Sequence, residues 1–136
     1  MRERLHVHDD VEHPRTVGLA LPAIRDRLLE FALSLPEAFE DQPWEEDTVA
    51  KVRKKIFVFL GATGSTHMTV KLDESHAHAL SIEGARPSAY GLGKSGWVTV
   101  PLRARGVTAA LLCDWIEESY RIVAPKRLLA ELDPIP

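Results

Sequence analysis

Two cations bracket a glycine-rich loop in the middle of the chain, and they form the part of the sequence best suited to binding an anion. Arg86 lies near the start of this loop and Lys94 near its end. No acidic residue occurs between Gly84 and Cys113. Lys and Arg side chains, helped by backbone N–H groups of a glycine loop, are typical phosphate contacts. The loop therefore indicates phosphate binding, and a strand beginning at Trp97 is expected to follow it.

Two further groups of cations lie in expected turns of a sheet. Arg53, Lys54 and Lys55 form a polar turn between two expected strands, and Arg103 and Arg105 follow a later strand. The whole chain has 17 Lys and Arg against 20 Asp and Glu, a formal net charge of −3. Attraction to nucleic acid must therefore come from a local patch. The alternative interpretation is that these are ordinary solvating charges.

Acidic residues concentrate between Glu37 and Asp47, where six occur without a base. Two carboxylates with a metal ion could carry out acid–base or phosphoryl chemistry, but such a run is more often a solvated loop or edge. His6, His8 and Asp10 would share one face of a strand and could hold a divalent ion, although a polar tail is the simpler interpretation. The sequence therefore predicts neither a metal nor a cofactor.

No catalytic arrangement stands out elsewhere, so the sequence predicts a protein that is not an enzyme. Cys113 has no histidine close in sequence and is expected to be a packed structural side chain. As the single cysteine it cannot form an internal disulfide, which fits a reduced, cytoplasmic setting. Residues 1–21 lack an apolar segment, so no signal peptide is expected, and no long apolar run predicts a membrane-spanning helix.

The elements that must position these residues follow from hydrophobic periodicity. Helices are expected over residues 22–34, 74–82, 108–123 and 126–132, and strands over 48–52, 56–60, 66–72 and 97–102. Asp73 and Thr108 are the expected caps of the second and third helices, and Trp97 is expected to be a core residue. This pattern predicts one compact α+β domain over residues 22–136, with an antiparallel sheet packed on one side by helices. A polar extension over residues 1–21 precedes it.

The central loop and the long helix after it carry a family resemblance. The matching residues are Arg86, Pro87, Ser88, Lys94, Trp97, Thr99 and Val100, followed on the helix by Glu118, Ser119 and Tyr120. In this order and spacing, over about residues 22–132, the chain resembles the MmcQ/YjbR-like family. It departs from the family pattern at Gly96, where the family has a histidine, and at Gly93, where it has an asparagine. A family histidine also often stands at the position of Tyr90 or Gly91.

The resemblance implies a domain similar to the CyaY fold that binds DNA through two wing-like loops of the sheet, with no established catalytic activity. The residues then expected to contact nucleic acid are Arg53, Lys54, Lys55, Arg86, Lys94, Arg103 and Arg105. The CyaY analogy also raises iron binding by an acidic ridge, which the run from Glu37 to Asp47 would supply. The alternative function is a protein-interaction module that binds no nucleic acid. No membrane partner is expected.

Overall fold

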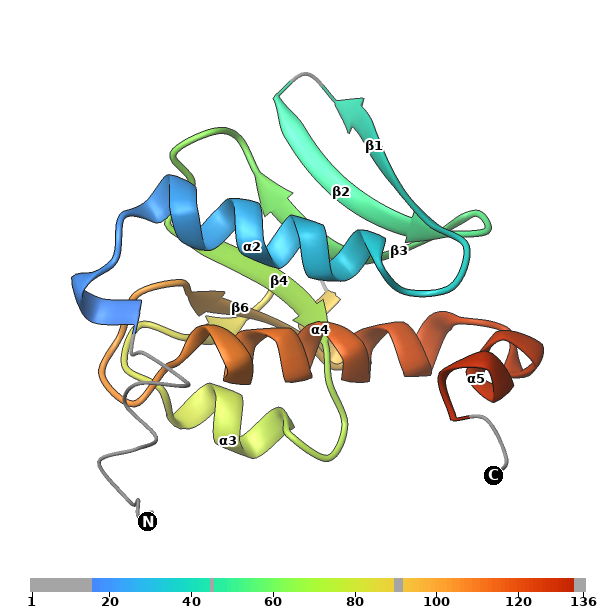
Figure 1. Cartoon of the computed structure of the whole chain (residues 1–136). Coiled ribbons are helices and arrows are strands. Elements are labelled where there is room, and N and C mark those ends of the chain that lie inside the picture. Colours follow the sequence, from blue (N-terminus) through green and yellow to red (C-terminus); the bar gives the residue numbers. More distant parts are fainter. Residues whose placement is uncertain (1–15, 45, 90–91, 134–136) are drawn as a thin grey trace, which may run out of the picture.

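Within the part of the chain that the computed structural model describes, residues 16–44, 46–89 and 92–133, six strands form one antiparallel sheet (Figure 1). The strands are β1 (Ala38–Trp44), β2 (Asp47–Val52), β3 (Lys55–Gly61), β4 (His67–Lys71), β5 (Arg86–Pro87) and β6 (Trp97–Pro101). They lie in the order β1-β2-β3-β4-β6-β5. The four expected strands are confirmed as β2, β3, β4 and β6, and the two outermost strands, β1 and β5, are added to them.

Helices cover one face of this sheet (Figure 1). α2 (Leu21–Leu33) and α4 (Ala109–Val123) pack against each other, α3 (His76–Ser81) lies beside β6, and α5 (Lys126–Leu132) follows α4. Two short 3₁₀ turns, η1 (Thr16–Gly18) and η2 (Leu92–Ser95), precede α2 and β6. None of the described helices is long and apolar enough to cross a bilayer. The structure is therefore the expected α+β domain, with a sheet packed on one side by helices.

The hydrophobic core lies between the sheet and the helices. Val58, Val70 and Val98 stand opposite one another on β3, β4 and β6, and all three are fully buried. Trp115 and Ile116 of α4 belong to the same core. Complete burial of an apolar side chain of this kind contributes about 1.5–3 kcal/mol, so the helix-facing half of the sheet supplies much of the stability.

The opposite face of the sheet, which we call the open face, carries Val49, Phe59, Thr69, Trp97 and Thr99. These residues alternate with core residues along β2, β3, β4 and β6. Phe59 and Trp97 are only partly buried and lie outside the core cluster. The expectation that Trp97 is a core residue is therefore wrong. Side chains alternate along a strand, and this alternation turns Trp97 to the face without helices.

One serine joins α4 to the sheet. β3 and β4 pair over only two residues each, and the Ser119 side chain enters where this pairing stops. Its hydroxyl donates to the carbonyl of Phe57 at 2.6 Å and accepts the backbone N–H of Lys71 at 2.9 Å. Ser119 is fully buried, so these bonds satisfy strand groups that water cannot reach.

The start of α3 depends on a residue far away in the sequence. A helix capped by Asp73 is expected from residue 74, but α3 begins at His76 and no side chain at its own N-cap forms a capping bond. Glu118 of α4 instead accepts the backbone N–H groups of Asp73 and Ser75, at 2.7 and 3.1 Å. A carboxylate from another element thus takes the role expected of a local cap.

Part of the expected N-terminal extension packs on the domain. Thr16 is fully buried, and its N–H and hydroxyl both donate to the Val107 carbonyl, at 3.0 and 3.3 Å. His6, His8 and Asp10 lie outside the described residues. The extension therefore contributes at least one buried contact from its last few residues.

Replacing Ser119 with alanine is expected to lower the free energy of unfolding by about 2–4 kcal/mol, because it leaves a buried carbonyl and a buried N–H without partners. Denaturant unfolding measures this loss. Ser81→Ala is the matched control, since Ser81 is exposed and its hydroxyl bonds only the His78 carbonyl of its own helix. Equal stability of the two variants would show that Ser119 does not hold the strands.

Candidate functional site

Two of the basic turns lie at one end of the sheet. Arg53 and Lys54 form the β2–β3 turn, and Lys55 begins β3. β4 runs antiparallel to β3 and ends there, so Lys71 lies beside the first residue of β6. Lys94 belongs to η2, which leads directly into β6. Strand direction therefore brings together two loops that are far apart in the sequence.

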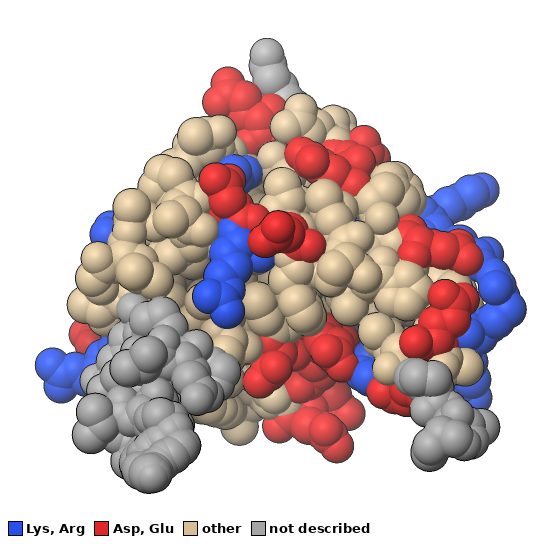
Figure 2. Space-filling model, in the orientation of Figure 1, with Lys and Arg blue, Asp and Glu red and all other residues tan. Residues whose placement is uncertain are grey.

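Helix α5 adds cations at the same end. The Glu37 carboxylate forms ion pairs with Arg53 at 2.9 Å and with Arg127 at 3.6 Å, so it links the β2–β3 turn to α5. We call this region the basic end, and its members are Arg53, Lys54, Lys55, Lys71, Lys94, Lys126 and Arg127. In Figure 2, Lys and Arg gather along the right-hand edge, where the β2–β3 turn and α5 lie in Figure 1.

Most cations of the basic end have no acidic partner. Among the described residues, no ion pair is formed by Lys54, Lys55, Lys71, Lys94 or Lys126. These ammonium groups are therefore available to an external anion. The rest of the face in Figure 2 shows Asp and Glu interspersed with Lys and Arg, so positive charge on that face is local.

The glycine loop at the basic end has a backbone shape that excludes other residues at one position. Gly96 has a φ of +94°, and a Cβ there would lie 2.8 Å from the carbonyl oxygen of Leu72. The N–H of Leu72 donates to the Gly96 carbonyl at 2.9 Å, which fixes the loop to the end of β4. The histidine that the resemblance leads one to expect at this position does not fit this backbone.

A pocket of about 520 Å³ lies at the basic end. Lys71, Lys94, His76 and Asp73 line it, together with backbone of the glycine loop. Two lysines from different elements therefore border one hollow. A phosphate group held between them would meet two cations at once.

The other expected nucleic-acid contacts lie elsewhere. Arg103 and Arg105 follow β6, at the end of the sheet opposite Lys94, and Arg103 donates to the Leu19 carbonyl at 3.3 Å. Arg86 lies on the edge strand β5, opposite Thr99 in the middle of β6. The expected cations therefore do not form one surface.

Aromatic and hydroxyl groups occupy the open face. The rings of Phe59 and Trp97 meet edge to face, with centroids 5.5 Å apart. The hydroxyls of Thr69 and Thr99 share a hydrogen bond of 2.9 Å. A second pocket, of about 270 Å³, lies against Phe59 and Thr69. This face thus offers a ring surface beside polar groups.

His67 lies at the start of β4, with Nδ1 2.7 Å from the Thr66 hydroxyl. Burial lowers the pKa of His67 below its ordinary value, and the nearby charge of Arg86 lowers it further, against a hydrogen bond with the Gly84 backbone that raises it. A histidine shifted in this direction is neutral at neutral pH. His67 therefore adds no positive charge to the open face under those conditions.

The family motif on α4 has a structural role. Tyr120 donates to the Pro36 carbonyl at 2.7 Å, and its ring packs edge to face on Phe57. Burial opposes ionisation of Glu118, but hydrogen bonds from the Ser75 hydroxyl and from the N–H groups of residues 73–75 hold the pKa of that carboxyl below its ordinary value. The three consecutive residues of the motif thus have separate roles. Glu118 positions α3, Ser119 positions the sheet, and Tyr120 positions the turn before β1.

Of the acidic run, Glu40 and Asp41 lie on the edge strand β1, and an edge is one of the two forms expected for the run. Asp41 on this strand pairs with Lys51 at 3.2 Å, and this hydrogen bond lowers the pKa of Asp41. Among the described residues, no group of three or more His, Cys, Asp or Glu could hold a metal ion. Cys113 is packed in the core as expected, and burial raises the pKa of its thiol.

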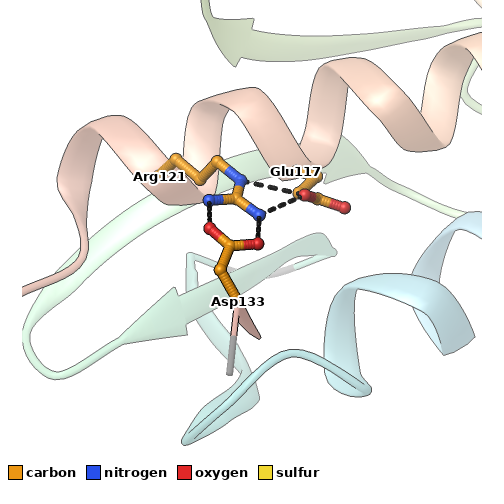
Figure 3. Close-up of polar contacts among 3 residues, drawn as sticks. All are labelled: Glu117, Arg121 and Asp133. Atoms are coloured by element: carbon orange, nitrogen blue, oxygen red, sulfur yellow. Dashed lines mark hydrogen bonds and ion pairs between the residues drawn. The ribbon is translucent and has the colours of Figure 1, made fainter. Parts of the chain in front are cut away.

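Arg121 holds α5 in place (Figure 3). Its guanidinium donates to Glu117 at 2.9 Å and makes two hydrogen bonds to Asp133, at 2.6 and 2.8 Å. These bonds raise the pKa of Arg121 and lower that of Asp133. The clamp fixes the end of α5 against α4, and α5 begins with Lys126 and Arg127 of the basic end.

Several residues of the candidate site have no recognisable signal in the sequence. Lys71 ends an alternating strand, and Lys126 and Arg127 begin a short helix, so nothing local distinguishes them from solvating charges. Their position becomes evident only from strand direction and from the Glu37 ion pairs. Phe59 lies in a continuous apolar run, which is typical of a strand buried on both faces.

A family model described as YjbR matches residues 33–122, more than half of the chain. The matched region runs from the end of α2 almost to the end of α4. It therefore includes all six described strands, the glycine loop and the motif on α4. No curated protein matches the sequence.

Trp97→Ala is expected to lower the free energy of unfolding by about 1–2 kcal/mol, because only part of the ring leaves water on folding. Trp115→Ala is the matched control. Trp115 is 1% exposed in the core, so its loss is expected to cost about 3–5 kcal/mol. Thermal or denaturant unfolding of both variants measures the difference. Equal losses would mean that Trp97 is a core residue after all.

The His67 ring is expected to titrate below the ordinary pKa of a histidine, which NMR of its ring protons measures. Because the folded pKa is lowered, the unfolded chain binds a proton more readily. The stability contributed by the neutral ring is therefore complete above the ordinary pKa and is lost as pH falls toward the folded pKa. Arg86→Gln is expected to raise the His67 midpoint. A wild-type midpoint at or above the ordinary value contradicts the prediction.

Proposed function

The chain belongs to the YjbR family, and we propose that it is a non-enzymatic DNA-binding protein that contacts phosphates through its basic end. One observation carries the proposal: the β2–β3 turn and the glycine loop lie at the same end of the sheet. Two such loops are what a double-wing arrangement requires. A sheet covered by helices on one face also agrees with a CyaY-like fold, which we include in the proposal.

The contact we propose is mainly electrostatic. Lys54, Lys55, Lys71 and Lys94 form no ion pair with a described carboxylate, so their ammonium groups can contact phosphates. A lysine ammonium attracts a phosphate as a point charge and does not offer the fixed planar set of donors that an arginine guanidinium has. We therefore expect this phosphate contact by itself to give little preference for DNA sequence. The turn after β6 takes no part, because it lies at the far end of the sheet.

We propose a cytoplasmic location for this activity. The protein has a single cysteine, Cys113, which is buried and free. A chain without an internal disulfide suits a reduced compartment.

A protein-interaction module is the second candidate function, and the edge strand β1 favours it. Phe39 and Trp44 on this strand are 43% and 57% exposed. An extended partner could pair with the outer edge of β1 and cover these rings. Pro43 and the neighbouring acidic residues weaken such pairing, so DNA binding is the better-supported proposal.

Binding to a short DNA duplex is expected at micromolar or weaker affinity. With about four phosphates neutralised, the logarithm of affinity should fall against the logarithm of salt with a slope of about −4. Changing Lys54, Lys55 and Lys94 together to glutamine should flatten this slope by about 2–3 and weaken all sequences alike. Fluorescence anisotropy over a series of salt concentrations measures both quantities.

The matched control changes Arg103 and Arg105 to glutamine, which removes cations from the opposite end of the sheet. This variant should keep the wild-type slope. If both variants lose affinity equally, the basic end is not the contact. If the folded wild-type protein does not bind DNA even at low salt, the DNA proposal fails and the protein-interaction module replaces it.

A further inference from the structure

The pocket on the open face is lined by an aromatic ring and by several polar side chains. Phe59 and Leu92 supply apolar surface, and Asp47, Ser65, Thr69 and Ser88 supply polar groups. Its volume is about 270 Å³, slightly below the range of about 300–1,000 Å³ that is usual for drug-sized ligands. A single planar ring system with a few hydrogen-bonding groups is the kind of ligand that suits this size and lining.

The ring of Phe59 is prepared to stack on such a ligand. It is partly exposed and lies outside the core cluster. Its edge-to-face contact with Trp97 holds its orientation from one side, and the pocket lies against it. An aromatic ring on a sheet face without helices is a typical stacking platform for unpaired bases.

Asp47 supplies the pocket with an unused hydrogen-bond acceptor. Among the described residues, its carboxylate takes part in no ion pair or side-chain hydrogen bond. An ionised carboxylate accepts hydrogen bonds and donates none. In base recognition, carboxylates accept from the exocyclic amino group of cytosine. Cytosine offers such an acceptor its exocyclic amino group, whereas thymine offers only its ring N3–H, so the pocket suits an amino-bearing base better.

Cations of the open face connect this pocket to the basic end. Arg86 stands opposite Thr99, which in turn stands opposite Thr69 at the pocket. Lys71 lies on the same strand face as Thr69 and also lines the pocket at the basic end. Neither Arg86 nor Lys71 forms an ion pair with any described carboxylate. Phosphates on either side of a bound base would meet these two cations.

We propose that the pocket on the open face binds one unpaired, amino-bearing nucleobase of a single DNA strand, stacked on Phe59 and hydrogen-bonded to Asp47. This inference rests on the proposed function and narrows it from DNA in general to single-stranded DNA. Stacking on Phe59 requires a base face that a duplex keeps covered by its neighbours. A single strand leaves that face free, and its flexible backbone can follow the cations to the basic end.

The test compares three fluorescently labelled DNA molecules of equal length at one moderate salt concentration: an oligo-deoxycytidine strand, an oligo-thymidine strand and a mixed-sequence duplex. The oligo-deoxycytidine strand should bind the wild-type protein about tenfold more tightly than the duplex, and more tightly than oligo-thymidine. Phe59→Leu should remove the preference for single strands. Asp47→Asn should remove the preference for cytosine over thymine. Phe31→Leu, on the helix-covered side, should change neither preference.

Each failure has a distinct reading. Duplex binding as tight as single-strand binding overturns this inference but leaves the proposed function standing, whereas no binding to any of the three molecules overturns both. A single-strand preference that survives in a folded Phe59→Leu variant also overturns the inference. Deoxycytidine monophosphate serves as a competitor: if it binds as tightly as the strand, the ligand is a free nucleotide and the single-strand assignment is wrong.

Discussion

The hydroxyl of Ser119 is the contact on which the rest of the structure depends. It bonds the carbonyl of Phe57 and the N–H of Lys71 where β3 and β4 stop pairing. The two central strands can therefore part without leaving buried backbone groups unsatisfied. The same contact fixes α4 across the sheet and sets the position of the end of β4. The position of Lys71 at the basic end therefore depends on the buried Ser119 of the helix layer.

Much of the fold was predictable because its signals are local. The amphipathic pattern and Thr108 predict α4, and the Leu111 N–H does donate to the Thr108 hydroxyl at 3.0 Å. The edge strand β5 was not predictable, since two residues carry no periodicity. The start of α3 was not predictable either, because Glu118, from a distant helix, decides where the backbone N–H groups find partners.

Predicting the candidate site was harder because its residues meet only in three dimensions. The sequence indicated three basic loops. The β2–β3 turn and the glycine loop share one end of the sheet, whereas the turn after β6 lies at the other end. Only the direction of the strands determines which loops are neighbours. The same holds for Trp97: alternation along β6 puts Trp97 and Thr99 on one face, but which face the helices cover cannot be read from one strand. Composition identified the charges and aromatic rings without showing which of them are neighbours.

Gly96 constrains how this part of the chain can evolve. Its left-handed backbone and the nearby Leu72 carbonyl leave no room for a side chain. A relative with histidine at this position must therefore have a differently shaped loop, and a single substitution cannot convert one shape into the other. We therefore expect the loop to change as a unit, through several coordinated replacements. Sequence variation across it should accordingly fall into discrete classes, with few intermediates between them.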